Sequence, residues 1–195
     1  MAQQQSTFVE EMMAAGRGVI SLLKGDRQAG GYFDLSHRGL AGSFIAVLLI
    51  TALNAVLPIM LGSESASIAR GVVTVVIMFA LQLGFAAIVL RQVNRMDGLL
   101  PYLVADNWAT FFLTLVSAAI AAAGLANDFT LLVLGVVVII VEVNIARLIV
   151  TLPPLQIAMF LIAQLVGVSV GMVLLAFLLP QAPELAQNAA AVLGQ

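Results

Sequence analysis

Long runs of apolar residues, separated by short polar links, dominate the pattern of the chain. A helix needs about 20 apolar residues to span about 30 Å of hydrocarbon, and five of the runs reach that length. They cover residues of about 40–61, 71–90, 107–126, 129–150 and 155–179. The pattern predicts an all-α membrane protein, a five-helix transmembrane bundle. A segment of residues 1–39 precedes the bundle and a tail of residues 180–195 follows it.

A different periodicity appears in residues 7–24. Apolar residues there share one face at about 100° per residue, whereas Glu10, Arg17 and Lys24 share the other. Thr7, with Glu10 three positions later, has the form of a capping box, which satisfies backbone amides at a helix start. We therefore expect an N-terminal amphipathic interfacial helix. It lies either on the cytoplasmic membrane surface or on the protein's own loops.

Composition agrees with a membrane protein whose main partner is the lipid bilayer. Of the 195 residues, 62% are hydrophobic and 9% are charged, and the mean hydropathy is +1.12. A soluble domain has roughly 45–50% apolar and about 25% charged residues, so the composition excludes a soluble globular domain. The N-terminus is polar and lacks the form of a cleavable signal peptide. We expect the first span to act as its own targeting signal.

The positive charges indicate an orientation. With five spans, only Arg70 lies on the side opposite the N-terminal segment. The other cationic residues share the N-terminal side: Arg17, Lys24, Arg27, Arg38, Arg91, Arg95 and Arg147. Because positively charged loops are retained in the cytoplasm, we expect a multi-pass protein of a bacterial inner membrane. Its N-terminus is then cytoplasmic and its C-terminal tail periplasmic.

Glu142 is the one carboxylate that these boundaries place inside a span, where an ionisable group is costly unless it is paired or faces a cavity. At a rise of about 1.5 Å per residue, Glu142 and Gln82 lie about 12 Å from the cytoplasmic ends of their spans. Gln164 lies about 14 Å and Thr114 about 10 Å from theirs. Four helices thus offer a polar side chain at a similar depth. This layer either lines a path for a proton, an ion or a small solute, or is a buried network that fixes helix register.

A row of small residues, Ala163, Gly167 and Gly171, recurs at intervals of four in the fifth span. Such a row allows close approach of helix backbones. We expect it to serve helix packing, either within the chain or at a homodimer seam.

Residues for other chemistry are sparse. The chain has no cysteine and a single histidine, His37, with no clustered carboxylates near it, so we expect no metal site. Its cationic residues are scattered singly and form no surface for nucleic acid. Neither a nucleophile elbow nor a glycine-rich phosphate loop occurs. We expect no catalytic residues, no cofactor and no enzyme activity.

Short stretches of the chain resemble a known family. They are Leu23-Lys24-Gly25-Asp26, Phe33-Asp34-Leu35-Ser36 followed by Arg38-Gly39 and Ser43-Phe44, and Asn107-Trp108. With the N-terminal segment and five closely spaced helices, the chain resembles small bacterial multi-span proteins related to the Yip-type family. Eukaryotic members of that family interact with Rab-type GTPases. The resemblance implies this architecture for nearly the whole chain.

The sequence favours a non-enzymatic integral membrane scaffold or an accessory component of a larger membrane complex. Its partners would be other membrane-protein subunits or a second copy of the chain. The alternative is a small transporter or channel with a polar layer around Glu142. A third hypothesis, a membrane-embedded enzyme that acts on lipid, would gain support from a second buried carboxylate or histidine.

Overall fold

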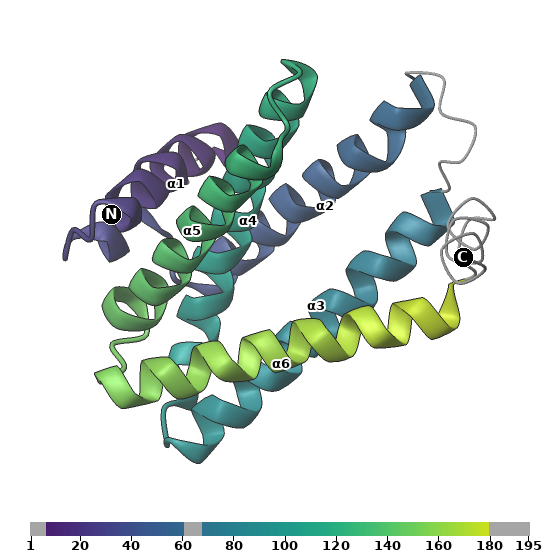
Figure 1. Ribbon diagram of the computed structural model, residues 1–195. Helices are drawn as coiled ribbons and strands as arrows, with labels where there is room; N and C mark the ends of the chain where they lie inside the picture. The colour runs from purple at the N-terminus through teal and green to yellow at the C-terminus, as the bar shows by residue number, and fades with distance from the viewer. Residues whose placement is uncertain (1–6, 61–67, 180–195) are drawn as a thin grey trace.

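The computed structural model describes residues 7–60 and 68–179, and this part of the chain consists of helices joined by short loops, without strands (Figure 1). The helices are α1 (Phe8–Leu23), α2 (His37–Met60), α3 (Ile68–Gln92), α4 (Leu99–Ala122), α5 (Asp128–Asn144) and α6 (Pro154–Leu178). Shorter turns are η1 (Ala29–Tyr32), η2 (Met96–Gly98) and the π-helical η3 (Ile145–Ile149). Helices α2 to α6 are long and apolar enough to cross a membrane. The predicted all-α membrane bundle is confirmed. The predicted tail at 180–195 and most of the link at 62–69 lie outside the described residues.

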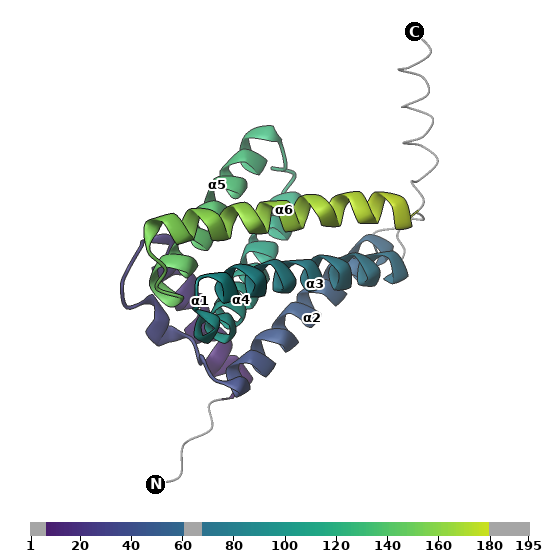
Figure 2. The ribbon, with the colours of Figure 1, turned by 90° about the horizontal axis from the view of Figure 1, so that it is seen from below.

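The helices form two groups. Helix α3 packs along α6, while α2 packs along α4, with α1 and α5 also on α4. The last turn of α5 and the first turn of α6 lie at a common end of the molecule, on either side of η3, and the two helices diverge from there (Figures 1 and 2). This shared end carries Arg38, Arg91, Arg95 and Arg147, and we call it the cationic end.

Helix α4 begins at Leu99, well before Asn107, where the sequence predicted the third span to start. Pro101 lies in the first turn of this helix, where a backbone N–H has no intrahelical partner to lose. The apolar helix that results places Asp106 and Asn107 inside a candidate span, Met96–Ala122. Both side chains are buried against neighbouring helices.

Helix α1 starts with the predicted capping box. The Thr7 amide donates to Glu10 Oε2 at 2.7 Å, and the Glu10 amide donates to Thr7 Oγ1 at 3.3 Å. One face of α1, with Val19 and Leu22, is buried against α4 and α5. Asn144 Nδ2 also donates to the Leu22 carbonyl at 2.8 Å, so α1 is held on the spanning helices. It also packs on the segment around η1, where Tyr32 and Phe33 lie against Gly18.

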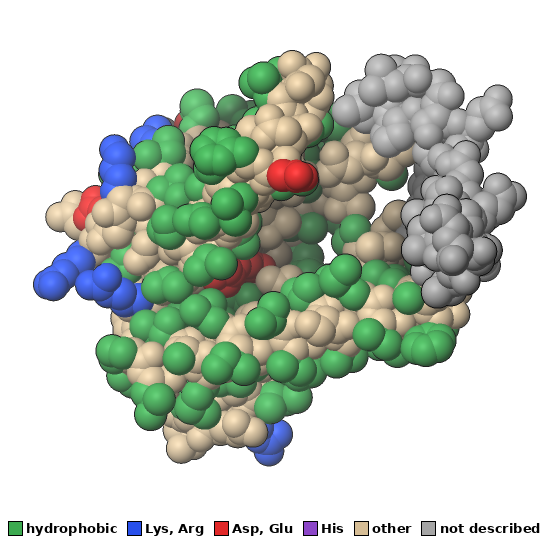
Figure 3. Space-filling model, viewed as in Figure 1, with side chains coloured by type: hydrophobic (Ala, Val, Ile, Leu, Met, Phe, Trp, Pro, Cys, Tyr) green, Lys and Arg blue, Asp and Glu red, His purple; other side chains and the backbone are tan. Residues whose placement is uncertain are grey.

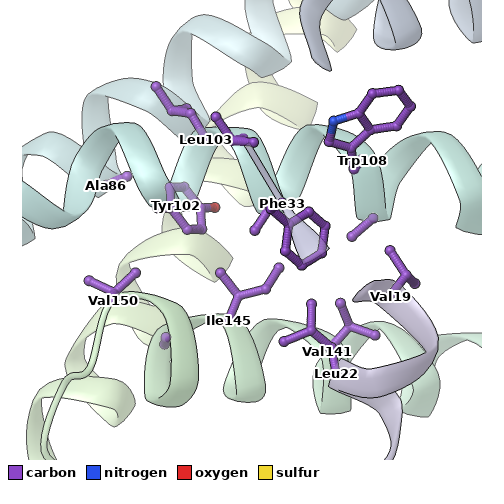
Figure 4. Close-up of a cluster of buried hydrophobic side chains, with 14 of the residues drawn as sticks. Val19, Leu22, Phe33, Ala86, Tyr102, Leu103, Trp108, Val141, Ile145 and Val150 are labelled. Carbon is purple, nitrogen blue, oxygen red and sulfur yellow. The ribbon is translucent and has the colours of Figure 1, made fainter. Parts of the chain in front are cut away.

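Buried hydrophobic side chains gather toward the cationic end (Figure 4). Tyr102 and Trp108 of α4 are fully buried, and the Tyr102 ring meets Phe160 of α6 edge to face, with ring centroids 4.9 Å apart. Val150 and Ile145 complete this packing. Large apolar side chains farther along α5 and α6, such as Leu132 and Phe177, are exposed, as expected where helices face lipid. The cationic end is therefore the closed end of the bundle.

The small residues of α6 face α3. A Cβ atom added at Gly167 would lie 2.9 Å from Phe85 Cδ2, and one added at Gly171 would collide with Met78 Sδ. Ala163 is half-buried against the core. The row therefore serves packing within the chain, the first of the two predicted alternatives.

Candidate functional site

Two carboxyl groups meet between α4 and α5. Asp106, only 3% exposed, lies in the third turn of α4, and Glu142 lies near the end of α5. Their carboxyl groups are within hydrogen-bonding reach of each other. Ionised carboxylates only accept hydrogen bonds, so a bond between the two needs a proton on one of them. Together they form a site that can hold one proton and one negative charge.

The expectation that Glu142 is the one carboxylate inside a span is wrong. Asp106 lies in the span Met96–Ala122, and the expectation failed because the third span was started too late in the sequence. The signal that could have revealed it is the apolar run on both sides, Leu99–Val104 and Trp108–Leu115, which only a helix starting before Asp106 accommodates.

Gln82 of α3 binds the Asp106 member of the pair from the other group of helices. Its Nε2 donates to Asp106 Oδ2 at 2.8 Å and lies 3.2 Å from the hydroxyl oxygen of Tyr102, which accepts. Tyr102 is itself fully buried. This network fixes the Asp106 carboxyl beside Glu142.

Two polar atoms near the pair lack partners. Glu142 Oε2 and Gln164 Nε2 are buried, and neither makes a hydrogen bond within the described part of the chain. An unpaired buried donor or acceptor costs about 1–3 kcal/mol, so such atoms call for an explanation, such as a bound ligand or water. Both residues line the same cleft.

Three clefts converge on the carboxyl pair. The first, of about 590 Å³, lies between α2, α3 and α4 and has Gln82 and Asp106 at one end. Its other polar residues are Thr51, Asn54, Thr74, Asn107, Thr110 and Thr114, and we call it the polar cleft.

The second cleft, of about 500 Å³, lies between α5 and α6 and reaches Gln82, Asp106 and Glu142. Its other walls are mainly aliphatic, and we call it the apolar cleft. Acidic side chains are visible at the base of the hollow between α5 and α6 (Figure 3). The third cleft, of about 280 Å³, lies between α4 and α5 and also reaches Glu142. Asp106 and Glu142 thus lie where the polar and apolar clefts meet.

The predicted polar layer is only partly assembled. Gln82, Glu142 and Gln164 line the apolar cleft together. Thr114 lies farther along α4, in the polar cleft and the third cleft, and is not beside Gln164.

The three clefts are lined by two acidic side chains, Asp106 and Glu142. No lysine, arginine or histidine described in the structure lines any of the three. The polar cleft runs from Asp106 toward Asn54 and Gly71, at the end of the bundle opposite the cationic end. The site is therefore suited to a proton or a cation and not to an anion.

Within residues 7–60 and 68–179, no group of three His, Cys, Asp or Glu side chains is placed to hold a metal ion. The second buried carboxylate, Asp106, is a feature that a membrane-embedded enzyme would also need, and the absence of enzyme activity stays a prediction. The resemblance to Yip-type proteins stays a prediction. Comparison of the chain with protein-family models, with curated proteins and with solved structures finds no match.

Proposed function

We propose that the protein is a small multi-pass transporter in which the Asp106–Glu142 pair exchanges a proton for a cation. One observation carries the proposal: two carboxyl groups lie buried side by side where clefts of a membrane domain meet. Ionisable residues inside spans are costly and commonly mark ion or proton paths. The scaffold role favoured by the sequence needs no such pair and stays a prediction.

The polar cleft supplies a path for water and protons to the pair. Hydroxyl and amide groups of Thr51, Asn54, Thr74 and Thr110 line it and can bind water. Beyond the pair, the packed side chains of Tyr102 and the cationic end close the path. If the cationic end is cytoplasmic, as the charge distribution predicts, the cleft opens to the periplasm.

Release on the other side requires the closed end to rearrange. The π-helical segment η3 begins three residues after Glu142 and joins α5 to the start of α6. Single π-helical turns are rare in proteins, and those that do occur are often found at functional sites. We place the moving element of the transport cycle at this segment.

The proposal is tested by charge movement after a pH jump, measured on proteoliposomes adsorbed to a solid-supported membrane. The wild-type protein should give a transient current that empty liposomes lack. Asp106→Asn and Glu142→Gln should each abolish it. Asp97→Asn is the matched control, because the Asp97 side chain is 71% exposed and lies in none of the clefts. A wild-type trace equal to that of empty liposomes would overturn the proposal, as would currents that survive both substitutions.

The path and the orientation are tested by labelling. The chain has no cysteine, so single cysteines at Thr51 and Thr74 can be probed with a membrane-impermeant maleimide. We expect labelling from the periplasmic side. Val136→Cys, exposed on α5 and outside the three clefts, should face lipid and stay unlabelled. Labelling from the cytoplasmic side alone would reverse the orientation, and no labelling at either threonine would contradict a water-filled cleft.

A further inference from the structure

The apolar cleft has two chemically different parts. Its base holds the carboxyl groups of Asp106 and Glu142 with the amides of Gln82 and Gln164. Its walls are aliphatic: Val138, Ile139, Leu161, Ile162, Leu165 and Val168. The volume of about 500 Å³ falls within the roughly 300–1,000 Å³ typical of ligand pockets. The cleft has room for an apolar body with a charged or polar group at the base.

The mouth of this cleft opens sideways. Ile139 of α5 and Ile162 and Leu165 of α6 line the cleft and are also 60%, 63% and 66% exposed. These helices diverge from the cationic end (Figure 1), and the hollow between them is flanked by apolar side chains (Figure 3). In a membrane, such a surface faces hydrocarbon. A ligand would therefore enter from the bilayer and not from water.

We infer that the cation exchanged at the Asp106–Glu142 pair is a lipophilic organic cation that enters the apolar cleft from the bilayer. This inference rests on the proposed function and specifies its substrate class. Charge selects the ligand, because acids are present at the base and basic residues are absent from the described lining. The aliphatic walls select against a hydrated inorganic ion, which needs several oxygen ligands.

The exchange balances in charge. When both carboxyl groups carry a proton, the pair is neutral. Binding of one monocation is matched by release of one proton from the pair through the polar cleft, which leaves one negative charge beside the bound cation. The low dielectric of the site strengthens the attraction between these two charges. Protons and the cation therefore compete for the pair.

The test uses tetraphenylphosphonium and purified protein in lipid nanodiscs, with binding measured by calorimetry and proton release by a dye in weak buffer. We expect saturable binding, with about one proton released per cation. In the pH range where the pair is protonated, the affinity should fall about tenfold for each unit by which the pH is lowered. Asp106→Asn and Glu142→Gln should weaken binding by at least about tenfold, which corresponds to about 1.4 kcal/mol. Tetramethylammonium, which has little apolar surface, should bind far more weakly.

A pair of neighbouring substitutions on α6 tests the cleft itself. Leu165→Trp places a bulky side chain in the cleft and should abolish tetraphenylphosphonium binding. Val166→Trp, on a residue that is exposed but lies outside the cleft, should leave tetraphenylphosphonium binding unchanged.

The outcomes separate the inference from the proposed function. If the pH-jump current is present but tetraphenylphosphonium does not bind, the inference is wrong and the transporter proposal stands. Binding that survives both carboxyl substitutions would identify the cleft as a slot for lipid chains and overturn the inference. Equal binding of tetramethylammonium would overturn the lipophilic substrate class. Loss of both binding and current in the wild-type protein would remove both proposals.

Discussion

Gln82 on α3 donates from Nε2 to Asp106 Oδ2 on α4 across 2.8 Å. Helix α3 packs mainly on α6, so this hydrogen bond joins the two groups of helices at the carboxyl pair. It therefore links the stability of the bundle to the geometry of the site.

Replacement of Gln82 by leucine should lower the free energy of unfolding by about 1–2 kcal/mol, since it removes a hydrogen bond to a carboxyl group inside a membrane domain. Trp108 is the single tryptophan and is fully buried, so its fluorescence can report unfolding in detergent. Gln164→Leu is the control: Gln164 Nε2 has no partner within the described chain, so its removal should cost nothing or stabilise. Equal losses in the two variants would show that the Gln82 hydrogen bond contributes nothing specific.

Local patterns predicted much of this fold. Runs of apolar residues gave all five spanning helices, and Thr7 with Glu10 gave the capping box. Both depend on residues close together in the chain, where helix geometry alone fixes the outcome. The packing of Gly167 and Gly171 also followed, because small residues on one face allow another helix to approach.

The site was harder to predict because depth along a helix does not give direction around it. Of the four residues at similar depth, Gln82, Glu142 and Gln164 line the apolar cleft together, whereas Thr114 lies about two turns beyond Asp106 on α4 and outside that cleft. Asp106 itself was missed because the third span was predicted to start at Asn107, whereas α4 begins at Leu99. Which neighbours a polar side chain meets depends on the crossing of helices, which no local pattern specifies.

The contact between α3 and α6 predicts a difference between two glycines. Gly167→Ala places a Cβ atom 2.9 Å from the Phe85 ring, which must shift, so we expect a loss of about 1–3 kcal/mol in the free energy of unfolding. Gly84→Ala on α3 meets nothing within 4 Å and should be neutral or stabilising by about 0.5–1 kcal/mol, since alanine favours helix. Thermal unfolding in detergent measures both. A Gly167→Ala variant as stable as Gly84→Ala would contradict this close packing.

Arg95 holds the junction between η3 and α6. Its Nη2 donates to the Val150 carbonyl at 2.6 Å and to Thr151 Oγ1 at 2.8 Å, and its Nη1 donates to the Thr151 carbonyl at 3.1 Å. Thr151 has φ of 60°, a left-handed conformation that non-glycine residues rarely adopt and that needs such support. Arg95→Met should therefore cost about 1.5–3 kcal/mol and speed hydrogen exchange at residues 150–152.

The control for Arg95 is its ion-pair partner. Asp97 lies 3.4 Å from Arg95 Nε and its side chain is 71% exposed, so Asp97→Asn should change the free energy of unfolding by less than about 1 kcal/mol. Hydrogen exchange at residues 150–152, measured by mass spectrometry on both variants, distinguishes the effect of the carbonyl contacts from that of the ion pair. If Asp97→Asn loosens the junction as much as Arg95→Met, the ion pair and not the carbonyl contacts holds it.

Glu11 on α1 gives the protein a predicted dependence on pH. Burial raises the pKa of the Glu11 carboxyl above its ordinary value of 4.5, and the nearby Asp34 carboxylate raises it further, whereas Arg38 and the Trp108 indole lower it. The folded state thus binds this proton more tightly than the unfolded state does. The contribution of Glu11 to stability is then fully present below pH 4.5 and is lost as the pH rises through the raised pKa.

Glu11→Gln should remove this loss, because a neutral amide has no proton to release. We expect the variant to match the wild-type protein near pH 4 and to exceed its free energy of unfolding near pH 7 to 8, measured by denaturant titration in detergent across that range. Glu10→Gln, one residue earlier and still able to complete the capping box, should retain the wild-type pH profile. A Glu11→Gln variant with the wild-type slope would show that Glu11 does not set the pH dependence, and the remaining slope would have to come from other groups.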